Sequence, residues 1–324
     1  MKNVPAVWYI IKADNNSNLK YRRIFMSDRY LIINADDFGM CNASVKAVTD
    51  LFQNENSALT SSTIMMPCQW AKAACKFAKN NPQFAIGTHL TFTSEWGDFR
   101  WAPVNTEKTD SLRDEEGFMW HESVDVEKHA DLDEIAGEIR AQVELSKKLG
   151  LTPSHLDNHM GSLYGIETGR FELLLKTLDI CSEYGLPFRL PRYLPPEMAQ
   201  NSTLEIKIDF EQLNAMYSQV IGYADMKGVA LPDYLIPNEW DGKDFRNYED
   251  FKEYIYELYK SCPNGVTETY MHPAVESDEI KSITGSWIHR FWEYQILSDP
   301  ATKQHIEANG IKLITYRDLA EMRK

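Results

Sequence analysis

The chain has 324 residues, of which 43% are hydrophobic and 25% charged, which is typical of a soluble globular protein with a sizeable core. Its formal net charge of -14 argues against a nucleic-acid or anionic-membrane partner, because phosphate groups are bound by basic surfaces. No apolar stretch approaches the ~20 residues that a membrane-spanning helix needs.

The five cysteines are odd in number and widely scattered, without the short paired spacings of a zinc ribbon or a disulfide framework. We interpret them as reduced thiols in a cytoplasmic protein. The first well-defined strand begins soon after Met26, so residues 1–25 are predicted to form a disordered N-terminal extension and residues 26–324 the folded domain. Residues 4–11 are apolar, but this segment is too short for a secretory signal and lacks a cleavage site.

Helical and extended patterns alternate along the rest of the chain. Strands are predicted at residues 30–33, 59–66, 84–92, 153–160, 187–190, 230–236, 266–272 and 311–316. Helices are predicted at residues 44–52, 70–79, 132–149, 170–184, 213–227, 248–260, 287–297 and 303–308, and again from 318 onward. The tryptophan-rich residues 95–131 are predicted as a lid or substrate loop, because long loops in compact domains are usually functional.

This alternation gives seven or eight β/α units, with no internal linker and no repeat. It favours an α/β fold made of a single (β/α) barrel, irregular or incompletely closed, over two doubly wound domains. In such a barrel the reactive side chains lie at the carboxyl ends of the strands. Ionisable residues gather at these predicted ends: Asp36, Asp37, His89, His155, Asp157, His159, Arg189 and His272.

The first of these positions is the pair Asp36 and Asp37, which follows the apolar run Leu31, Ile32 and Ile33. Neighbouring carboxylates at the end of a buried strand repel each other and lose hydration, and a metal ion is a common compensation. An ordinary turn before Gly39 would explain the same residues. Likewise, His89 on an apolar strand and His272 before Pro273 each have a structural explanation when taken alone.

The triplet His155, Asp157 and His159 is harder to explain structurally. In a strand with a period of two, all three side chains point to one face, and unpaired polar groups are costly inside a barrel. Two imidazoles and one carboxylate make an open site that suits Zn²⁺ or another divalent transition ion, and Mg²⁺ less naturally. One histidine of the triplet could be a ligand that the aspartate orients, or both histidines could be ligands.

Five short motifs stand in order along the chain: Asn34-Ala-Asp-Asp-Phe-Gly39, Gly87-Thr-His-Leu90, Ser154-His-Leu-Asp-Asn-His159, Phe188-Arg-Leu-Pro-Arg192 and Met271-His-Pro273. Together they resemble the YdjC-like carbohydrate deacetylases, which include chitooligosaccharide deacetylase and are similar to the polysaccharide deacetylases. The resemblance extends from about residue 28 to the C-terminus. The sequence departs from the family pattern after His159, where Met160 and Gly161 replace a further histidine-containing run.

This resemblance implies hydrolysis of acetyl groups from N-acetylated amino sugars or short oligosaccharides, with one divalent metal ion, Zn or Mg. It implies that Asp37, His89 and His155 bind the metal, with His155 preferred over His159. It further implies that Asp36 is the general base, Arg189 orients this base, and His272 is the general acid. Asp157, His159 and Arg192 are then expected to bind substrate or support the ligands.

Two other functions are compatible with the sequence. The same metal site could hydrolyse another bond such as a phosphate ester, although few basic residues beyond Arg189 and Arg192 stand at the predicted mouth. The chain could also be a non-enzymatic sugar-binding protein, against which the adjacent Asp36 and Asp37 argue. The expected partner is a small carbohydrate, with no nucleic acid and no membrane, and a homo-oligomer is compatible with the sequence.

Overall fold

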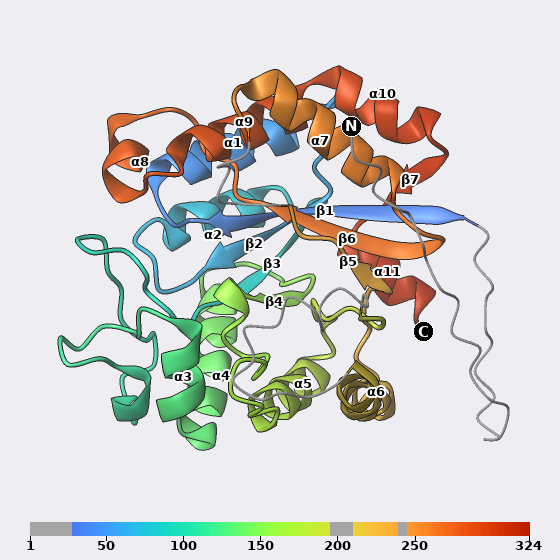
Figure 1. Ribbon diagram of the computed structural model, residues 1–324. Helices are drawn as coiled ribbons and strands as arrows, with labels where there is room; N and C mark the ends of the chain where they lie inside the picture. The colour runs from blue at the N-terminus through green and yellow to red at the C-terminus, as the bar shows by residue number, and fades with distance from the viewer. Residues whose placement is uncertain (1–27, 195–209, 239–244) are drawn as a thin grey trace, which may run out of the picture.

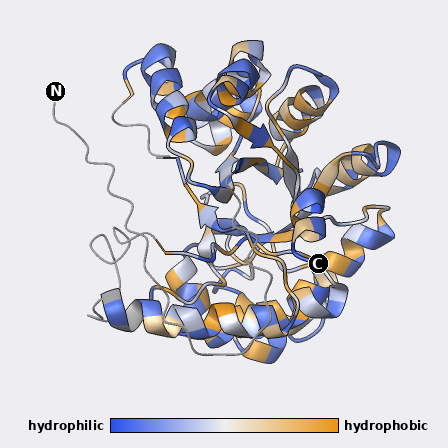
Figure 2. Cartoon of the chain, turned by 90° about the vertical axis from the view of Figure 1, so that its right-hand side faces the viewer, coloured by the Kyte–Doolittle hydropathy of each residue, from blue (hydrophilic) through white to orange (hydrophobic). Residues whose placement is uncertain are grey.

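The computed structural model describes residues 28–194, 210–238 and 245–324. The predicted N-terminal extension, residues 1–25, lies outside the described residues. In the described part, helices surround a central group of parallel strands, and Figure 2 shows that many of these helices mix hydrophobic and hydrophilic positions. None of the described helices is long and apolar enough to cross a membrane. All five cysteines are free and buried, as expected for reduced thiols.

The central strand is β1 (Arg29–Phe38), which is buried from Leu31 onward. It pairs in parallel with β6 (Gly265–Met271) along one edge. Along the other edge it pairs with β7 (Ile311–Leu313) near its start and with β2 (Ser61–Met65) near its end. Figure 1 shows β1 and β6 side by side at the centre of the molecule. The aspartate pair therefore lies at the end of the central strand of the fold.

The remaining strands are β3 (Ala85–Leu90), β4 (Leu156–Asn158) and β5 (Tyr234–Leu235), and the sheet order is β4-β3-β2-β1-β6-β5. Backbone hydrogen bonds close the gap between β4 and β5. Arg189 donates to Leu156 at 3.1 Å, and Phe188 donates to Ala230 at 3.1 Å. Because the ring closes through irregular segments, the predicted irregular (β/α) barrel is confirmed.

Nine of the eleven α-helices among the described residues lie close to predicted positions, and the two at Ser123–His129 and Asp278–Ile283 were not predicted. The helices are α1 (Asn42–Gln53), α2 (Ala71–Asn80), α3 (Ser123–His129), α4 (Leu132–Lys148), α5 (Glu172–Tyr184), α6 (Phe210–Met226), α7 (Tyr248–Lys260), α8 (Asp278–Ile283), α9 (Trp287–Ser298), α10 (Pro300–Ala308) and α11 (Tyr316–Met322). The short 3-10 helices are η1 (Asp110–Leu112) and η2 (His159–Gly161). Side-chain caps begin several of them; Asp131, for example, accepts hydrogen bonds from the first turn of α4.

Three predicted strands are much shorter than expected, and the one predicted at 230–236 is reduced to the two residues of β5. The stretch predicted as a strand from 153 to 160 is extended as β4 only over Leu156–Asn158. It then turns into η2, where Met160 adopts a left-handed conformation with φ 53°. Of the strand predicted at 187–190, only an isolated bridge from Phe188 to Leu156 is formed. These differences come from the irregular closure of the barrel, which local residue preferences do not encode.

The predicted substrate loop, residues 95–131, contains η1 and α3 and is held against α4. Glu138 of α4 is fully buried and accepts hydrogen bonds from the backbone N–H groups of Val104 at 2.9 Å and Asn105 at 2.8 Å. Burial raises the pKa of this carboxyl. One side chain thus fixes the middle of the loop to the barrel.

Candidate functional site

The end of β1 has an irregular backbone that brings both of its aspartate side chains to the mouth of the barrel. In a regular strand, adjacent side chains point to opposite faces. Here the register with β2 shifts between Ala35 and Phe38, and Asp37 has φ 58°, a left-handed conformation that aspartate tolerates better than most residues. Both carboxylates are consequently buried at the mouth of the barrel, and each has its own partners.

Three side-chain atoms converge beside Asp37. His89 Nε2 and His159 Nδ1 each lie 3.5 Å from Asp37 Oδ1. Asp37 Oδ1 and His89 Nε2 are buried and accept or donate no hydrogen bond among the described residues. Ligands 2.0–2.2 Å from a tetrahedral metal lie about 3.4 Å apart, so this spacing fits a divalent ion. The three residues also form a group whose ligand atoms are close enough to share one metal.

The carboxylate of Asp157 fixes the orientation of the His89 ring. Its Nδ1 lies 2.7 Å from Asp157 Oδ1, and Asp157 Oδ2 accepts a hydrogen bond from Thr63 at 2.7 Å. A carboxylate on one ring nitrogen holds the proton there and leaves the lone pair of the other nitrogen for a metal. Asp157 thus directs His89 Nε2 toward Asp37.

Arg189 is the counter-ion of Asp36. Its two terminal nitrogens donate to the two oxygens of Asp36, each at 2.6 Å, and its Nε donates to Glu268 at 2.8 Å. The same guanidinium lies 3.0 Å from Asp157. Burial would lower the pKa of Arg189, but the surrounding carboxylates, Asp36 first, raise it well above its ordinary value. Burial raises the pKa of Glu268 to about 7.

A second arginine, Arg290 of α9, reaches the other aspartate. Its terminal nitrogen donates to Asp37 Oδ2 at 2.8 Å, and both side chains are buried. Burial alone would raise the pKa of Asp37, but Arg290 and the nearby histidines hold this pKa well below its usual range. Asp37 is therefore an anion with one oxygen paired and the other directed toward the two imidazoles.

The structure brings His159, and not His155, to Asp37 and His89. The ring of His155 stacks on Tyr316 at 3.7 Å, with Nε2 3.2 Å from Asn34 Oδ1 and Nδ1 2.9 Å from Ser154 Oγ. Burial lowers the pKa of His155 to about 3, so the ring is neutral. The two histidines differ because His155 precedes β4, whereas His159 follows it in η2, so the two side chains lie at opposite ends of the strand.

Two further predicted residues have different surroundings. His272 follows β6 directly and is half-buried, with its backbone N–H donating to Glu293 at 2.7 Å. Burial holds the pKa of its ring well below the ordinary value, although the charge of Asp37 opposes this. Arg192 instead forms an ion pair with Asp225 at 2.7 Å, outside the cluster.

Several residues of this cluster were not predicted from the sequence. Arg290 carried no local signal, because it lies in an ordinary amphipathic helix far along the chain. Asn34 stands two residues before Asp36 on β1 and donates to it at 2.8 Å, so the period of the strand could have indicated it. Glu95, whose carboxylate lies 3.1 Å from His159 Nε2, lies five residues after the end of β3 and begins the predicted long loop. That place in the loop did not by itself indicate a contact with His159.

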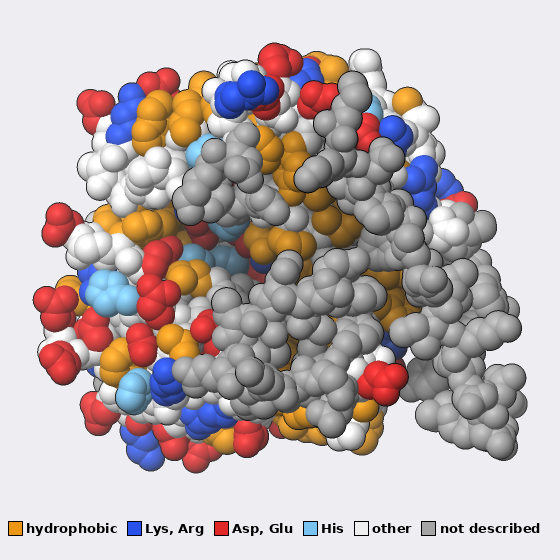
Figure 3. All heavy atoms as spheres, in the orientation of Figure 1, with side chains coloured by type: hydrophobic (Ala, Val, Ile, Leu, Met, Phe, Trp, Pro, Cys, Tyr) orange, Lys and Arg blue, Asp and Glu red, His pale blue; other side chains and the backbone are white. Residues whose placement is uncertain are grey.

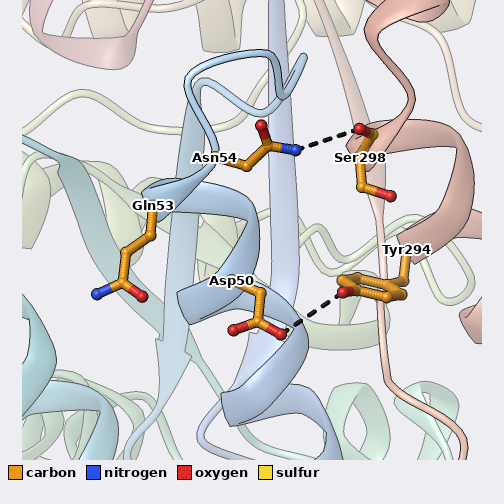
Figure 4. A pocket seen from close by; sticks show the side chains of 5 residues that line it. All are labelled: Asp50, Gln53, Asn54, Tyr294 and Ser298. Atoms are coloured by element: carbon orange, nitrogen blue, oxygen red, sulfur yellow. Dashed lines mark hydrogen bonds between the residues drawn. The ribbon is translucent and has the colours of Figure 1, made fainter.

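The cluster lies below a hollow in one face of the molecule. Figure 3 shows histidine side chains at the bottom of this hollow, with acidic and hydrophobic atoms around them. A separate surface pocket lies between the C-terminal ends of α1 and α9 and is lined by Asp50, Gln53, Asn54, Tyr294 and Ser298 (Figure 4). This second pocket contains none of the clustered residues.

The fold and the cluster define an α/β barrel protein with a buried aspartate and histidine site at the carboxyl ends of its strands. The chain belongs to the YdjC-like protein family, whose model matches residues 30–308. The family resemblance predicted from the five motifs is thereby confirmed.

Named relatives cover almost the whole chain. A carbohydrate deacetylase of Enterococcus faecalis is 29% identical over 300 residues, which cover 91% of this chain and 100% of that protein. A chitooligosaccharide deacetylase of Yersinia enterocolitica is 27% identical over 298 residues, covering 90% and 99% of the two chains. A solved structure of a candidate cellobiose-phosphate cleavage protein from Enterococcus faecalis V583 is 27% identical, with a TM-score of 0.68 over 90% of this chain and 99% of the other.

Proposed function

We propose that this protein is a metal-dependent hydrolase that removes acetyl groups from N-acetylated amino sugars or short oligosaccharides. The observation that carries the proposal is the convergence of His89 Nε2 and His159 Nδ1 on Asp37 Oδ1, each at 3.5 Å. The names of relatives that match over nearly their full lengths support the reaction and the carbohydrate substrate. The free cysteines support a reducing, cytoplasmic location.

We assign the metal to Asp37, His89 and His159, replacing His155 in the ligand set implied by the resemblance. Two imidazoles and a carboxylate suit Zn²⁺, and Mg²⁺ is the second candidate. When bound, such an ion polarises a carbonyl oxygen and makes water a stronger acid. The donor set leaves further coordination positions for water and substrate.

Asp36 is assigned as the general base. Its Oδ2 lies 3.9 Å from His89 Nε2, so it borders the same donor group as Asp37 while its own partner is Arg189. The two-point pairing with Arg189 holds the carboxylate plane in one orientation. Asp36 can therefore receive a proton from water beside the cluster without itself moving.

His272 is assigned as the general acid. It stands at the end of β6, where its ring interacts electrostatically with Asp37, His89 and His159. An imidazole whose pKa is held low is neutral at rest, so it can receive a proton during the reaction and pass it to the leaving amine. The backbone hydrogen bond to Glu293 fixes the position of the residue.

Phosphate-ester hydrolysis is less well supported than amide hydrolysis. A phosphate needs cationic donors, yet the two buried arginines are both committed to carboxylates, Arg189 to Asp36 and Arg290 to Asp37. Arg192 is paired with Asp225 outside the cluster. The site therefore favours a neutral acetamide.

The test is a screen of N-acetylglucosamine and N,N′-diacetylchitobiose for released acetate, with the metal-loaded protein and after chelator treatment. We expect release that the chelator abolishes and that added Zn²⁺ or Mg²⁺ restores. Asp36→Asn should retain metal binding while its rate falls by about 10²–10⁴-fold, the usual contribution of a general base. The proposal is wrong if the metal-loaded wild-type protein releases acetate from neither sugar, or if the rate is insensitive to chelator.

A further inference from the structure

The long loop after β3 contributes a carboxylate to the far side of His159. Glu95 Oε2 lies 3.1 Å from His159 Nε2, while His159 Nδ1 faces Asp37 Oδ1 at 3.5 Å. The imidazole is only about 5% exposed and the carboxylate 18% exposed. The ring of His159 thus lies between two carboxylates, one from the barrel and one from the loop.

The two cluster histidines have the same arrangement of partners around their rings. His89 has Asp157 on Nδ1 and presents Nε2 to Asp37, whereas His159 has Glu95 on Nε2 and presents Nδ1. In both rings, the carboxylate on the outer nitrogen selects the tautomer whose lone pair points at the same oxygen. The difference is that Asp157 belongs to a barrel strand and Glu95 to a loop.

His159 needs such a partner more than His89 does. It begins η2, a three-residue turn that contains the left-handed Met160, so no regular element fixes its side chain. The loop near Glu95 is well anchored by comparison. The Ser94 N–H donates to Trp120 at 2.7 Å, and Ser94 Oγ accepts from the Trp101 N–H at 3.0 Å.

We infer that Glu95 is a positioning residue that holds His159 with its proton on Nε2 and its Nδ1 lone pair toward Asp37 and His89. The inference rests on the proposed function, because it assigns a metal to these three residues. It adds that the substrate loop contributes to metal affinity.

The experiment titrates Zn²⁺, and separately Mg²⁺, into metal-depleted protein by calorimetry. Glu95→Ala removes the partner of His159, and we expect metal affinity to fall by about 10–100-fold, as is usual when such a supporting group is lost. Glu95→Gln keeps an amide oxygen that can accept the Nε2 proton but lacks the charge, so its loss should be smaller. The matched control is Glu116→Ala, another carboxylate of the same loop, whose side chain is 73% exposed and lies 3.6 Å from Arg100. Its metal affinity should equal that of the wild type.

A second readout separates positioning from a purely structural role. If Glu95 only positions the ligand, acetate release by Glu95→Ala should recover when the metal concentration is raised, and the far-ultraviolet circular dichroism should be unchanged. Equal metal affinity of the wild type and Glu95→Ala overturns the inference and leaves the proposed function standing. A wild-type protein that binds neither metal overturns both.

Discussion

Arg189 donates to both oxygens of Asp36, at 2.6 Å each, from a segment 153 residues further along the chain. The same guanidinium also contacts Asp157 and Glu268. A single buried cation therefore faces three carboxylates, which makes it a centre of the electrostatics of the site.

Arg189→Lys should destabilise the protein strongly. A lysine cannot reproduce the two-point pairing, and leaving buried carboxylates unpaired costs about 3–5 kcal/mol. The free energy of unfolding from urea titration measures the effect. Arg140→Lys is the control, because the pair of Arg140 with Glu183 joins α4 to α5 at the surface, where ion pairs contribute at most about 1 kcal/mol. Equal losses in the two variants would contradict this account.

His155 and His159 should respond differently to replacement. His159→Ala removes the proposed ligand atom that faces Asp37. We therefore expect metal affinity to fall by roughly 100-fold or more, which exceeds the effect of losing a supporting group. His155→Gln should leave metal affinity within about threefold, because its ring faces Asn34 and Tyr316 instead. Calorimetric titration of both variants decides the assignment. Loss of binding in His155→Gln alone would restore His155 as the ligand.

Metal binding should raise the thermal stability. A ligand that binds only the folded state stabilises it by about 2.7 kcal/mol at 100 times its Kd, and each kcal/mol shifts Tm by roughly 1–2 °C in a chain of 324 residues, because the entropy of unfolding grows with chain length. Differential scanning calorimetry with and without Zn²⁺ measures the shift. Asp37→Asn is the control and should show none, since its amide replaces the anionic donor. A shift in Asp37→Asn equal to that of the wild type would exclude Asp37 as a ligand.

Glu293 should make stability depend on pH. Burial raises the pKa of this carboxyl from 4.5 to about 7, so the folded protein keeps its proton over a range in which the unfolded chain loses it. The associated stability is complete below pH 4.5 and is lost as pH rises through about 7. The wild type should therefore lose stability relative to Glu293→Gln across this window, by at most about 1.4 kcal/mol per pH unit. Urea unfolding at several pH values measures the difference, and parallel curves for the two proteins would refute it.

Local sequence was sufficient for most of the secondary structure, because the apolar periods of its helices and strands are strong. The helix predicted at 248–260 coincides with α7, and that predicted at 132–149 with α4 to within one residue. The strand predictions were poorest at 153–160, 187–190 and 230–236. There the barrel closes through single bridges and a left-handed turn, which depend on contacts between distant segments.

The sequence by itself determined that Asp36, Asp37, His89 and His272 stand where parallel strands end, and parallel strands bring their carboxyl ends together. It could not decide between His155 and His159, because that choice depends on where β4 stops and how η2 turns. Nor could it indicate Arg290 or the contact of Glu95 with His159. Those side chains come from a helix and a loop that only tertiary packing directs to the mouth of the barrel, so no local period records them.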